Sequence, residues 1–189
     1  MYRTLAFLAC AAMLPMAGCT DYGTVEQGRV IGYNKKTGQV ILIRDSTGGQ
    51  VAKPVYDALP PITVQAPGDP DEMGPDPQAG KLMRVDMKNH QLVIYDAAGK
   101  QFRTIPYTLL GEPRTVAKGT GLPAIDKSKQ TITIYNPAQH LALTIAATDE
   151  LLAMPADTWK TGDEIRYYFR DPAQALRMMN VTRTDLNKS

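Results

Sequence analysis

The sequence predicts a mainly β protein built from antiparallel hairpins, with one short helix. Apolar and polar residues alternate with a period of two along several segments, including 131–135 and 164–169. Polar turns, several of which contain glycine, separate these segments. Two stretches, 28–43 and 80–95, repeat the order strand, polar turn, strand, and residues 119–135 form a looser third copy that Pro123 interrupts. Half-buried hairpins of this kind favour an antiparallel sheet that curls or closes to remove its edges.

The first 18 residues have the layout of a secretory signal peptide. Arg3 gives a short positive start, an apolar stretch runs from Leu5 to Leu14, and Ala17 and Gly18 are small. The stretch is shorter than the roughly 20 apolar residues that cross a membrane. We therefore expect residues 1–18 to direct secretion and then to be removed.

Residues 14–19, Leu-Pro-Met-Ala-Gly-Cys, resemble the signal box of bacterial lipoproteins, although Met16 stands where Leu is commoner and Pro15 is a departure. The resemblance implies that cleavage falls just before Cys19, whose thiol carries diacylglycerol and whose new amine carries an acyl chain such as palmitate. Residues 19–27 would then be a membrane tether. Thr20 directly after the cysteine favours the outer over the inner membrane. An ordinary cleaved signal that leaves a free thiol is the alternative.

Composition limits the remaining possibilities. Cys10 lies within the signal, so the mature chain would hold no cysteine pair for a disulfide and no thiolate zinc site. The formal net charge of +2 and the lack of a clustered basic run give no indication of a nucleic-acid partner. No phosphate-binding glycine loop occurs, and we expect no cofactor.

The prolines suggest a division of the mature chain. Residues 54–79 hold seven of the 14 prolines, and residues 67–79 read as an extended acidic linker. This predicts a β-hairpin unit at 28–66 and a main β-barrel domain of OB or SH3 type at 80–185. Calcium binding by the acidic residues of this linker, Asp69, Asp71, Glu72 and Asp76, is an alternative to a solvated loop.

A short helix and a set of core strands are expected in the main domain. Thr148 can cap the helix, Asp149 and Glu150 suit its first turn, and Pro155 ends it. Alternation predicts one barrel core with these apolar residues: Val85, Leu92, Ile94, Ile132, Ile134, Leu143, Ile165, Tyr167 and Phe169.

The segment from Trp159 to Phe169 contains Lys-x-Gly-Asp-x-Ile-Arg, which is similar to the end of small periplasmic OB-fold barrels that bind copper or silver. That resemblance implies a soft-metal site of histidine, methionine and tryptophan. The Met-x-Met pattern of that family is missing here. His140, Met154 and Trp159 are the candidates, and a buried Met154 and Trp159 with an exposed His140 is the competing interpretation.

Over its mature length the chain also resembles an uncharacterised lipoprotein family of sulfate-reducing bacteria, a domain of unknown function. The shared features are the Ala-Gly-Cys start, the Gly-Arg and Gly-Lys hairpins, and the segments 162–169 and 174–182. This resemblance implies no activity and no site residues.

These observations favour a non-enzymatic protein. We expect a lipid-anchored module of the cell envelope that faces the periplasm and serves as a binding or scaffold unit for an envelope protein partner. Tyr168, Arg166 and Arg170 form the predicted binding surface, because aromatic and arginine side chains anchor interfaces; a plain amphipathic outer face is the alternative. Soft-metal binding comes second. A hydrolase comes third, because the chain has only three serines and two histidines.

Overall fold

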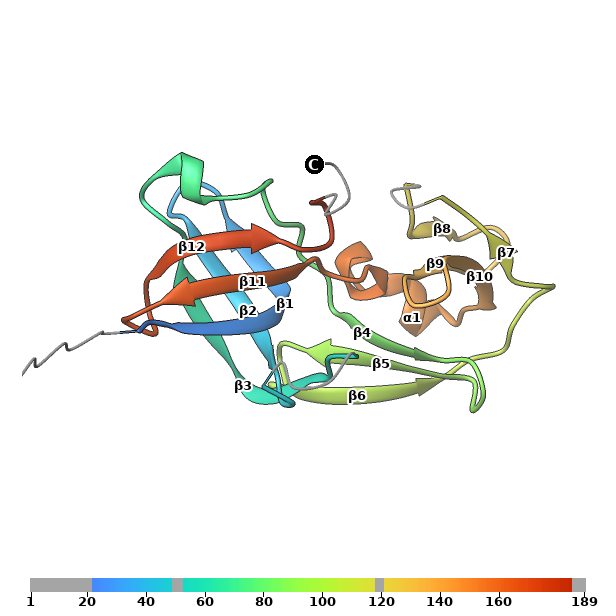
Figure 1. Ribbon diagram of the computed structural model, residues 1–189. Coiled ribbons are helices and arrows are strands. Elements are labelled where there is room, and N and C mark those ends of the chain that lie inside the picture. Colours follow the sequence, from blue (N-terminus) through green and yellow to red (C-terminus); the bar gives the residue numbers. More distant parts are fainter. Residues whose placement is uncertain (1–21, 49–52, 118–120, 185–189) are drawn as a thin grey trace, which may run out of the picture.

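Strands dominate the computed structural model, which describes residues 22–48, 53–117 and 121–184. The described residues form three antiparallel sheets, and helix is confined to short segments. The predicted mainly β class is therefore confirmed. Figure 1 shows one sheet at one end of an elongated molecule and the two others at the opposite end. Three sheets thus take the place of the single predicted barrel.

The largest sheet has five strands in the order β12-β11-β1-β2-β3. β11 pairs with β1 in a register that runs from Phe169 opposite Thr24 to Glu164 opposite Arg29. This pairing crosses the predicted division between the 28–66 and 80–185 units, because β11 and β12 share a sheet with the first three strands; the boundaries as such stay a prediction. The strands are β1 (Thr24–Asn34), β2 (Gln39–Asp45), β3 (Tyr56–Gln65), β11 (Glu164–Phe169) and β12 (Ala175–Asn180).

The five-stranded sheet curls around its own core. Alternate side chains of β1, β2, β3 and β11, among them Val30, Leu42, Val64 and Tyr167, are buried on its inner face. Its edge strands β3 and β12 approach each other at one corner. There the backbone N–H of Gln65 donates to the carbonyl of Ala173 over 2.7 Å. The sheet is therefore curled and partly closed.

Residues 67–79, hereafter the strap, run along the free edge of β12. The strap contains a short 3-10 helix, η1 (Pro70–Glu72), which Asp69 caps. The backbone N–H of Gly74 donates to the carbonyl of Met178 over 2.8 Å, and Met73 packs against the core of the sheet. The side chain of Glu72 pairs with Arg177. The predicted extended loop is thus fixed on the sheet and covers part of an edge that would otherwise be unpaired.

Residues 82–159, hereafter the insert, form the other two sheets, ordered β4-β5-β6 and β7-β10-β9-β8. Apolar side chains from both sheets meet in one core, which also holds Leu152 and Trp159. The strands are β4 (Leu82–Asp86), β5 (Gln91–Asp96), β6 (Gln101–Pro106), β7 (Arg114–Thr115), β8 (Ala124–Asp126), β9 (Thr131–Asn136) and β10 (Leu141–Ala146).

The two sheets of the insert contain one three-stranded unit twice, β4-β5-β6 and β8-β9-β10, shifted by 40 residues, and β7 adds a fourth strand to the second sheet. β5 and β6 correspond position by position to β9 and β10. Buried residues correspond as well, so that Leu92 matches Ile132 and Ile105 matches Ile145. The predicted second and third hairpin copies are the first part of this larger repeat. β8 has only three residues after Pro123, in agreement with the predicted weakness of that strand.

The hairpin turns share one chemistry. Each strand before the turn ends in Asn or Asp, whose side-chain oxygen accepts a backbone N–H two residues later, as Asp86 does from Lys88 and Asn136 does from Ala138. The residue four positions after the Asn or Asp has a positive φ, as at Gly38 and His140. The five turns of this kind end at Gly38, His90, Lys100, Gln130 and His140.

Two short helices lie between β10 and β11. The predicted helix is α1 (Asp149–Ala153), and the side chain of Thr148 caps it by accepting the N–H of Leu151. A 3-10 helix, η2 (Ala156–Trp159), follows after Pro155 and buries the ring of Trp159 in the core of the insert.

The predicted core residues separate into two cores. Leu92, Ile94, Ile132, Ile134 and Leu143 are buried in the insert, where Val85 is half-buried. By contrast, Ile165, Tyr167 and Phe169 are buried inside the five-stranded sheet. The single predicted core is wrong because the strands from 164 onwards pair with β1 and not with the strands of the insert.

The chain enters and leaves the insert at two glycines that lie side by side. The N–H of Gly80 donates to the carbonyl of Val30, and the N–H of Val30 donates to the carbonyl of Asp163. A Cβ atom on Gly162 would overlap the carbonyl oxygen of Val30, and one on Gly80 would overlap that of Lys160. Both positions therefore require glycine for the close approach of two backbones.

Candidate functional site

The outer face of the five-stranded sheet carries two of the three predicted binding residues. In the observed register Val25, Tyr168 and Arg177 lie side by side on β1, β11 and β12, and Gln27, Arg166 and Met179 form the next row. Their neighbours along the strands, such as Tyr167, point into the core. We call these six residues the outer face.

Tyr168 is half-buried because its ring packs on the backbone that leads into β1. A Cβ atom on Gly23 would collide with the ring of Tyr168. The backbone N–H of Gly23 donates to the hydroxyl oxygen of Tyr168 over 3.3 Å. This side chain therefore positions the start of β1 while one side of its ring remains on the surface.

Arg166 is an exposed cation on β11, and Arg170 is an exposed cation that follows this strand. Nη2 of Arg166 donates to Oε1 of Gln27 over 3.1 Å, and Arg170 lies one residue beyond the end of the strand. Neither side chain forms an ion pair with any residue that the structure describes. The structure thus brings Arg166 and Tyr168 onto one face and places Arg170 at its border.

A hollow of about 630 Å³ opens beside Arg166. Its charged lining is balanced, because Arg44 and Arg166 face Glu26 and Asp45. Arg44 and Glu26 form an ion pair at 3.5 Å, and the buried hydroxyl of Tyr167 donates to Oε2 of Glu26 over 2.8 Å. Burial, together with the nearby carboxylate of Glu26, raises the pKa of Tyr167 above its ordinary value. Tyr167 therefore stays protonated and holds this end of the curled sheet together.

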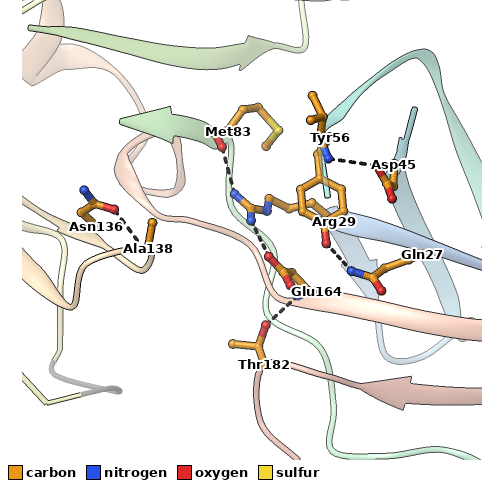
Figure 2. Close-up of polar contacts among 10 residues, drawn as sticks. Gln27, Arg29, Asp45, Tyr56, Met83, Asn136, Ala138, Glu164 and Thr182 are labelled. Carbon is orange, nitrogen blue, oxygen red and sulfur yellow. Dashed lines mark hydrogen bonds and ion pairs between the residues drawn. The ribbon is translucent and has the colours of Figure 1, made fainter. Parts of the chain in front are cut away.

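A second polar cluster lies where the sheet meets the insert, and Figure 2 shows it. Arg29 is buried; Nη1 donates to the carbonyl of Met83 over 2.9 Å and Nη2 to Oε1 of Glu164 over 2.7 Å. Its guanidinium also lies over the ring of Tyr56 at 4.5 Å, a cation–π contact. Burial, with the nearby carboxylate of Glu164, raises the pKa of Tyr56.

A bulge in β4 explains why Met83 faces this cluster. The register of β4 against β5 shifts between Leu82 and Arg84. Alternation predicts Met83 and Val85 on one face, but Met83 packs with Tyr56 and Tyr95 between the sheets whereas Val85 faces the core of the insert. A bulged residue leaves the ladder locally unpaired, so its carbonyl is available to Arg29.

Residues 162–164, within the Lys-x-Gly-Asp-x-Ile-Arg motif, lie where the five-stranded sheet, the strap and the insert meet, hereafter the joint. Beyond Gly162, the buried carboxylate of Asp163 accepts the backbone N–H of Gln78, the side-chain amide of Asn180 and Nε of Arg183, at 2.7–2.9 Å. Glu164 then pairs with Arg29, and Ile165 enters the core. Thr182, in the second shared segment, accepts the N–H of Glu164. Both segments behind the family resemblance therefore fasten the sheet, the strap and the insert together.

The three metal candidates occupy different surroundings. Trp159 is fully buried, and Met154 packs against the same core of the insert. His140 is exposed at a hairpin turn, where Nδ1 lies 2.7 Å from the hydroxyl of Tyr135. Among the described residues no group of three or more His, Cys, Asp or Glu side chains could hold a metal ion. The soft-metal site stays a prediction.

The serines considered for a hydrolase and the acidic residues considered for calcium form hydrogen bonds in turns, a helix cap and ion pairs. Ser128 donates to Asp126, and Ser46 donates to the carbonyl of Val55. Of the acidic residues suggested for calcium, Asp69 caps η1, Glu72 pairs with Arg177, and Asp76 binds Lys35 and Tyr33.

Sequence reasoning missed the cluster around Arg29 and the network of Asp163. Arg29 stands in a strand that reads as an ordinary hairpin, and Asp163 reads as a turn residue. The only signal in the sequence is the pair Gly162-Asp163 before a strand, which indicates a small β-barrel fold and does not indicate a contact between the sheet and the insert.

Comparison with known proteins places the chain in a family but not in a functional class. No curated protein and no solved structure matches it. No helix in the described ranges is long and apolar enough to cross a membrane. The lipoprotein box, the bacterial group and the similarity to OB-fold metal proteins stay predictions, whereas the family itself is confirmed. A family model matches residues 21–189, and the chain therefore belongs to the domain of unknown function DUF4881.

Proposed function

We propose that this protein is a lipid-anchored module of the cell envelope, tethered through Cys19, which faces the periplasm and binds a partner without catalysis. One observation supports it most. The start of β1 lies at the end of the elongated molecule that is opposite the insert (Figure 1), and β1 begins at Thr24. An anchor five residues before Thr24 would hold that end near a membrane and would present the insert to the periplasm.

The signal-like start of the chain supports the anchor. One acyl chain binds a membrane only reversibly, whereas two or more on one cysteine anchor it stably. The short spacing between Cys19 and Thr24 also suits a folded domain held close to the lipid surface, because a fully extended five-residue segment spans about 18 Å.

The use of polar groups in the fold supports binding over catalysis. The two tyrosines with the largest shifts in pKa, Tyr56 and Tyr167, are held by fixed contacts with Gln27 and Glu26. Asp163 is occupied by three donors. Arg166 and Arg170, at the outer face and its border, are exposed and form no ion pair among the described residues, which suits recognition.

The first test is the intact mass of the protein from bacterial membranes, measured beside a Cys19→Ala variant. We expect a mature chain that begins at Cys19 and carries the mass of a diacylglyceryl group and an acyl chain. The variant should keep its signal segment and carry no lipid. An unmodified wild-type chain, soluble in the periplasm, would refute the proposed anchor.

A further inference from the structure

The surface around the start of β1 combines exposed aromatic, aliphatic and cationic side chains. Tyr22 is 83% exposed and Val25 is 58% exposed, although both are large and apolar or amphipathic. Tyr168 lies beside Val25 in the register of β1 and β11. Arg166 lies two residues before Tyr168 on β11, and Arg170 directly follows the strand. We call these five residues the tether-side surface.

The two charged residues of the tether-side surface, Arg166 and Arg170, are both positive, and the carboxylate of Asp45 in the hollow beside Arg166 is held by Thr47 and Val55. Arg44 is paired with Glu26, and Arg177 with Glu72. The nearest carboxylate to Arg170 in sequence, Asp171, accepts the backbone N–H of Ala173 over 2.9 Å. Arg166 and Arg170 remain without an ion pair among the described residues and are exposed.

The distance to the anchor decides which partner this surface meets first. A tether from Cys19 to Thr24 cannot exceed about 18 Å, even fully extended. Electrostatic attraction to a charged surface reaches about 8 Å in physiological salt. Arg170 follows Phe169, the residue opposite Thr24 in the register of β1 and β11, so a short tether would hold this end of the surface close to the lipid headgroups. The headgroups would then be the first partner that the surface meets.

The chemistry also fits a lipid surface. Tyrosine favours the boundary between headgroups and acyl chains, because its ring is apolar and its hydroxyl is polar. Arginines attract anionic lipids, and an exposed aliphatic side chain such as Val25 adds apolar contact. We propose that the tether-side surface binds anionic phospholipid headgroups of the membrane that holds Cys19, and so fixes the orientation of the domain. This inference rests on the proposed anchoring through Cys19.

The test uses the lipidated protein reconstituted into vesicles of phosphatidylcholine, with or without phosphatidylglycerol. Because Cys19 is acylated, Val25→Cys supplies a single reactive thiol on the tether-side surface, and Ser128→Cys supplies one at an exposed turn of the insert. The rate of maleimide labelling is then measured for each thiol. We expect phosphatidylglycerol to slow labelling at position 25 at least fivefold and to leave position 128 unchanged.

A matched pair of variants tests the charge. Arg166→Gln with Arg170→Gln removes the two cations of the surface, and Arg84→Gln with Arg114→Gln removes two exposed cations of the insert for the same change in net charge. One basic residue contributes about fivefold to binding at an anionic surface, so the first pair should abolish the protection. The second pair should preserve it.

The outcomes separate the two proposals. Protein that does not float with either vesicle is not anchored, and the proposed function fails. Protein that floats while position 25 labels equally on both vesicles overturns the headgroup contact but leaves the anchor intact. Labelling at position 25 could instead slow only after envelope proteins are added, on vesicles of either composition. That result would assign the surface to a protein partner and would also overturn the headgroup contact.

Discussion

The five-stranded sheet and the insert are both antiparallel, yet they are assembled in different ways. The insert repeats a local unit in which each strand pairs with the next along the chain. The five-stranded sheet joins β1–β3 to β11 and β12, so Gln27 pairs with Arg166 across the whole insert. The insert is therefore stabilised by neighbours in sequence, whereas the sheet depends on the joint that brings distant segments together.

The largest expected effect is at the joint. Gly162→Ala would place a Cβ atom on the carbonyl oxygen of Val30, which itself accepts the N–H of Gly80. Because backbone and not a flexible side chain is in the way, we expect a loss of about 4 kcal/mol or more in the free energy of unfolding. Urea denaturation followed by circular dichroism measures it.

Gly68→Ala is the control for this prediction. A Cβ atom on Gly68 meets no atom within 4 Å, and this glycine has no positive φ. Its substitution should change stability by less than about 0.5 kcal/mol. Equal stability of the two variants would show that the close approach of the backbones at the joint can relax.

The next effect distinguishes the two cores. Ile134→Ala removes a fully buried side chain from the insert, and Ile165→Ala removes one from the sheet. Each should cost about 3 kcal/mol. The single tryptophan, Trp159, lies in the core of the insert, so its fluorescence reports unfolding there. We expect Ile134→Ala to shift that transition by the full amount and Ile165→Ala to shift it by less than about 1 kcal/mol.

Hydrogen exchange of β1 and β11 supplies the reciprocal measurement. Ile165→Ala should accelerate exchange in these strands, whereas Ile134→Ala should have the smaller effect there. Ile41→Ala, at a partly exposed position of the sheet, serves as the control with little change in either probe. If both core variants shifted both probes equally, the sheet and the insert would unfold as one cooperative unit.

A smaller effect is expected at the contact between the two regions. Arg29→Met removes the hydrogen bonds to Met83 and Glu164 and leaves a carboxylate that is only partly exposed. We expect a loss of about 2 kcal/mol. Arg103→Ala, which breaks an exposed pair with Glu150, should cost under about 1 kcal/mol. Thermal unfolding of both variants measures these losses. If the two variants lost similar free energies of unfolding, the burial of Arg29 would add no stability beyond that of an exposed ion pair.

The same difference between local and distant contacts explains what sequence could predict. The hairpins, the cap at Thr148 and the weak strand before Asp126 depend on residues a few positions apart, and their patterns are visible in the sequence. The pairing of β11 with β1 joins segments more than 130 residues apart. The alternation of side chains in a strand does not indicate which strand it pairs with, so the sequence predicts a single core where the structure has two.

The candidate surface follows the same rule. Arg166 and Tyr168 could be placed on one face because side chains alternate along a single strand. The contact of Tyr168 with Gly23, and the role of Arg29 beside Met83, required the positions of other strands. A bulge in β4 also reversed the side chain of Met83, which no period of two predicts.

The smallest expected effect concerns the strap, which belongs to the sheet but is held by exposed pairs. Arg177 lowers the pKa of Glu72, and Lys35 with Tyr33 lowers the pKa of Asp76, from ordinary values of 4.5 and 3.8. A carboxyl with a lowered pKa in the folded state stabilises that state above its ordinary pKa, and the contribution is lost as pH falls through the lowered value. The strap should therefore loosen only in acid, below about pH 4.5.

Proteolysis within residues 67–79, or hydrogen exchange of Gly74, measures this loosening at pH 7 and near pH 3. Exchange is expressed as a protection factor, the intrinsic rate of an unstructured peptide at the same pH divided by the observed rate. Glu72→Gln with Asp76→Asn should lower the protection factor of Gly74 at pH 7 and remove most of its dependence on pH. Asp69→Asn is the control, because its amide oxygen still caps η1. The two pairs are exposed, so salt should weaken them as well. If the protection factor of Gly74 changed with neither pH nor salt, the backbone contact with Met178 and the packing of Met73 would hold the strap without its charges.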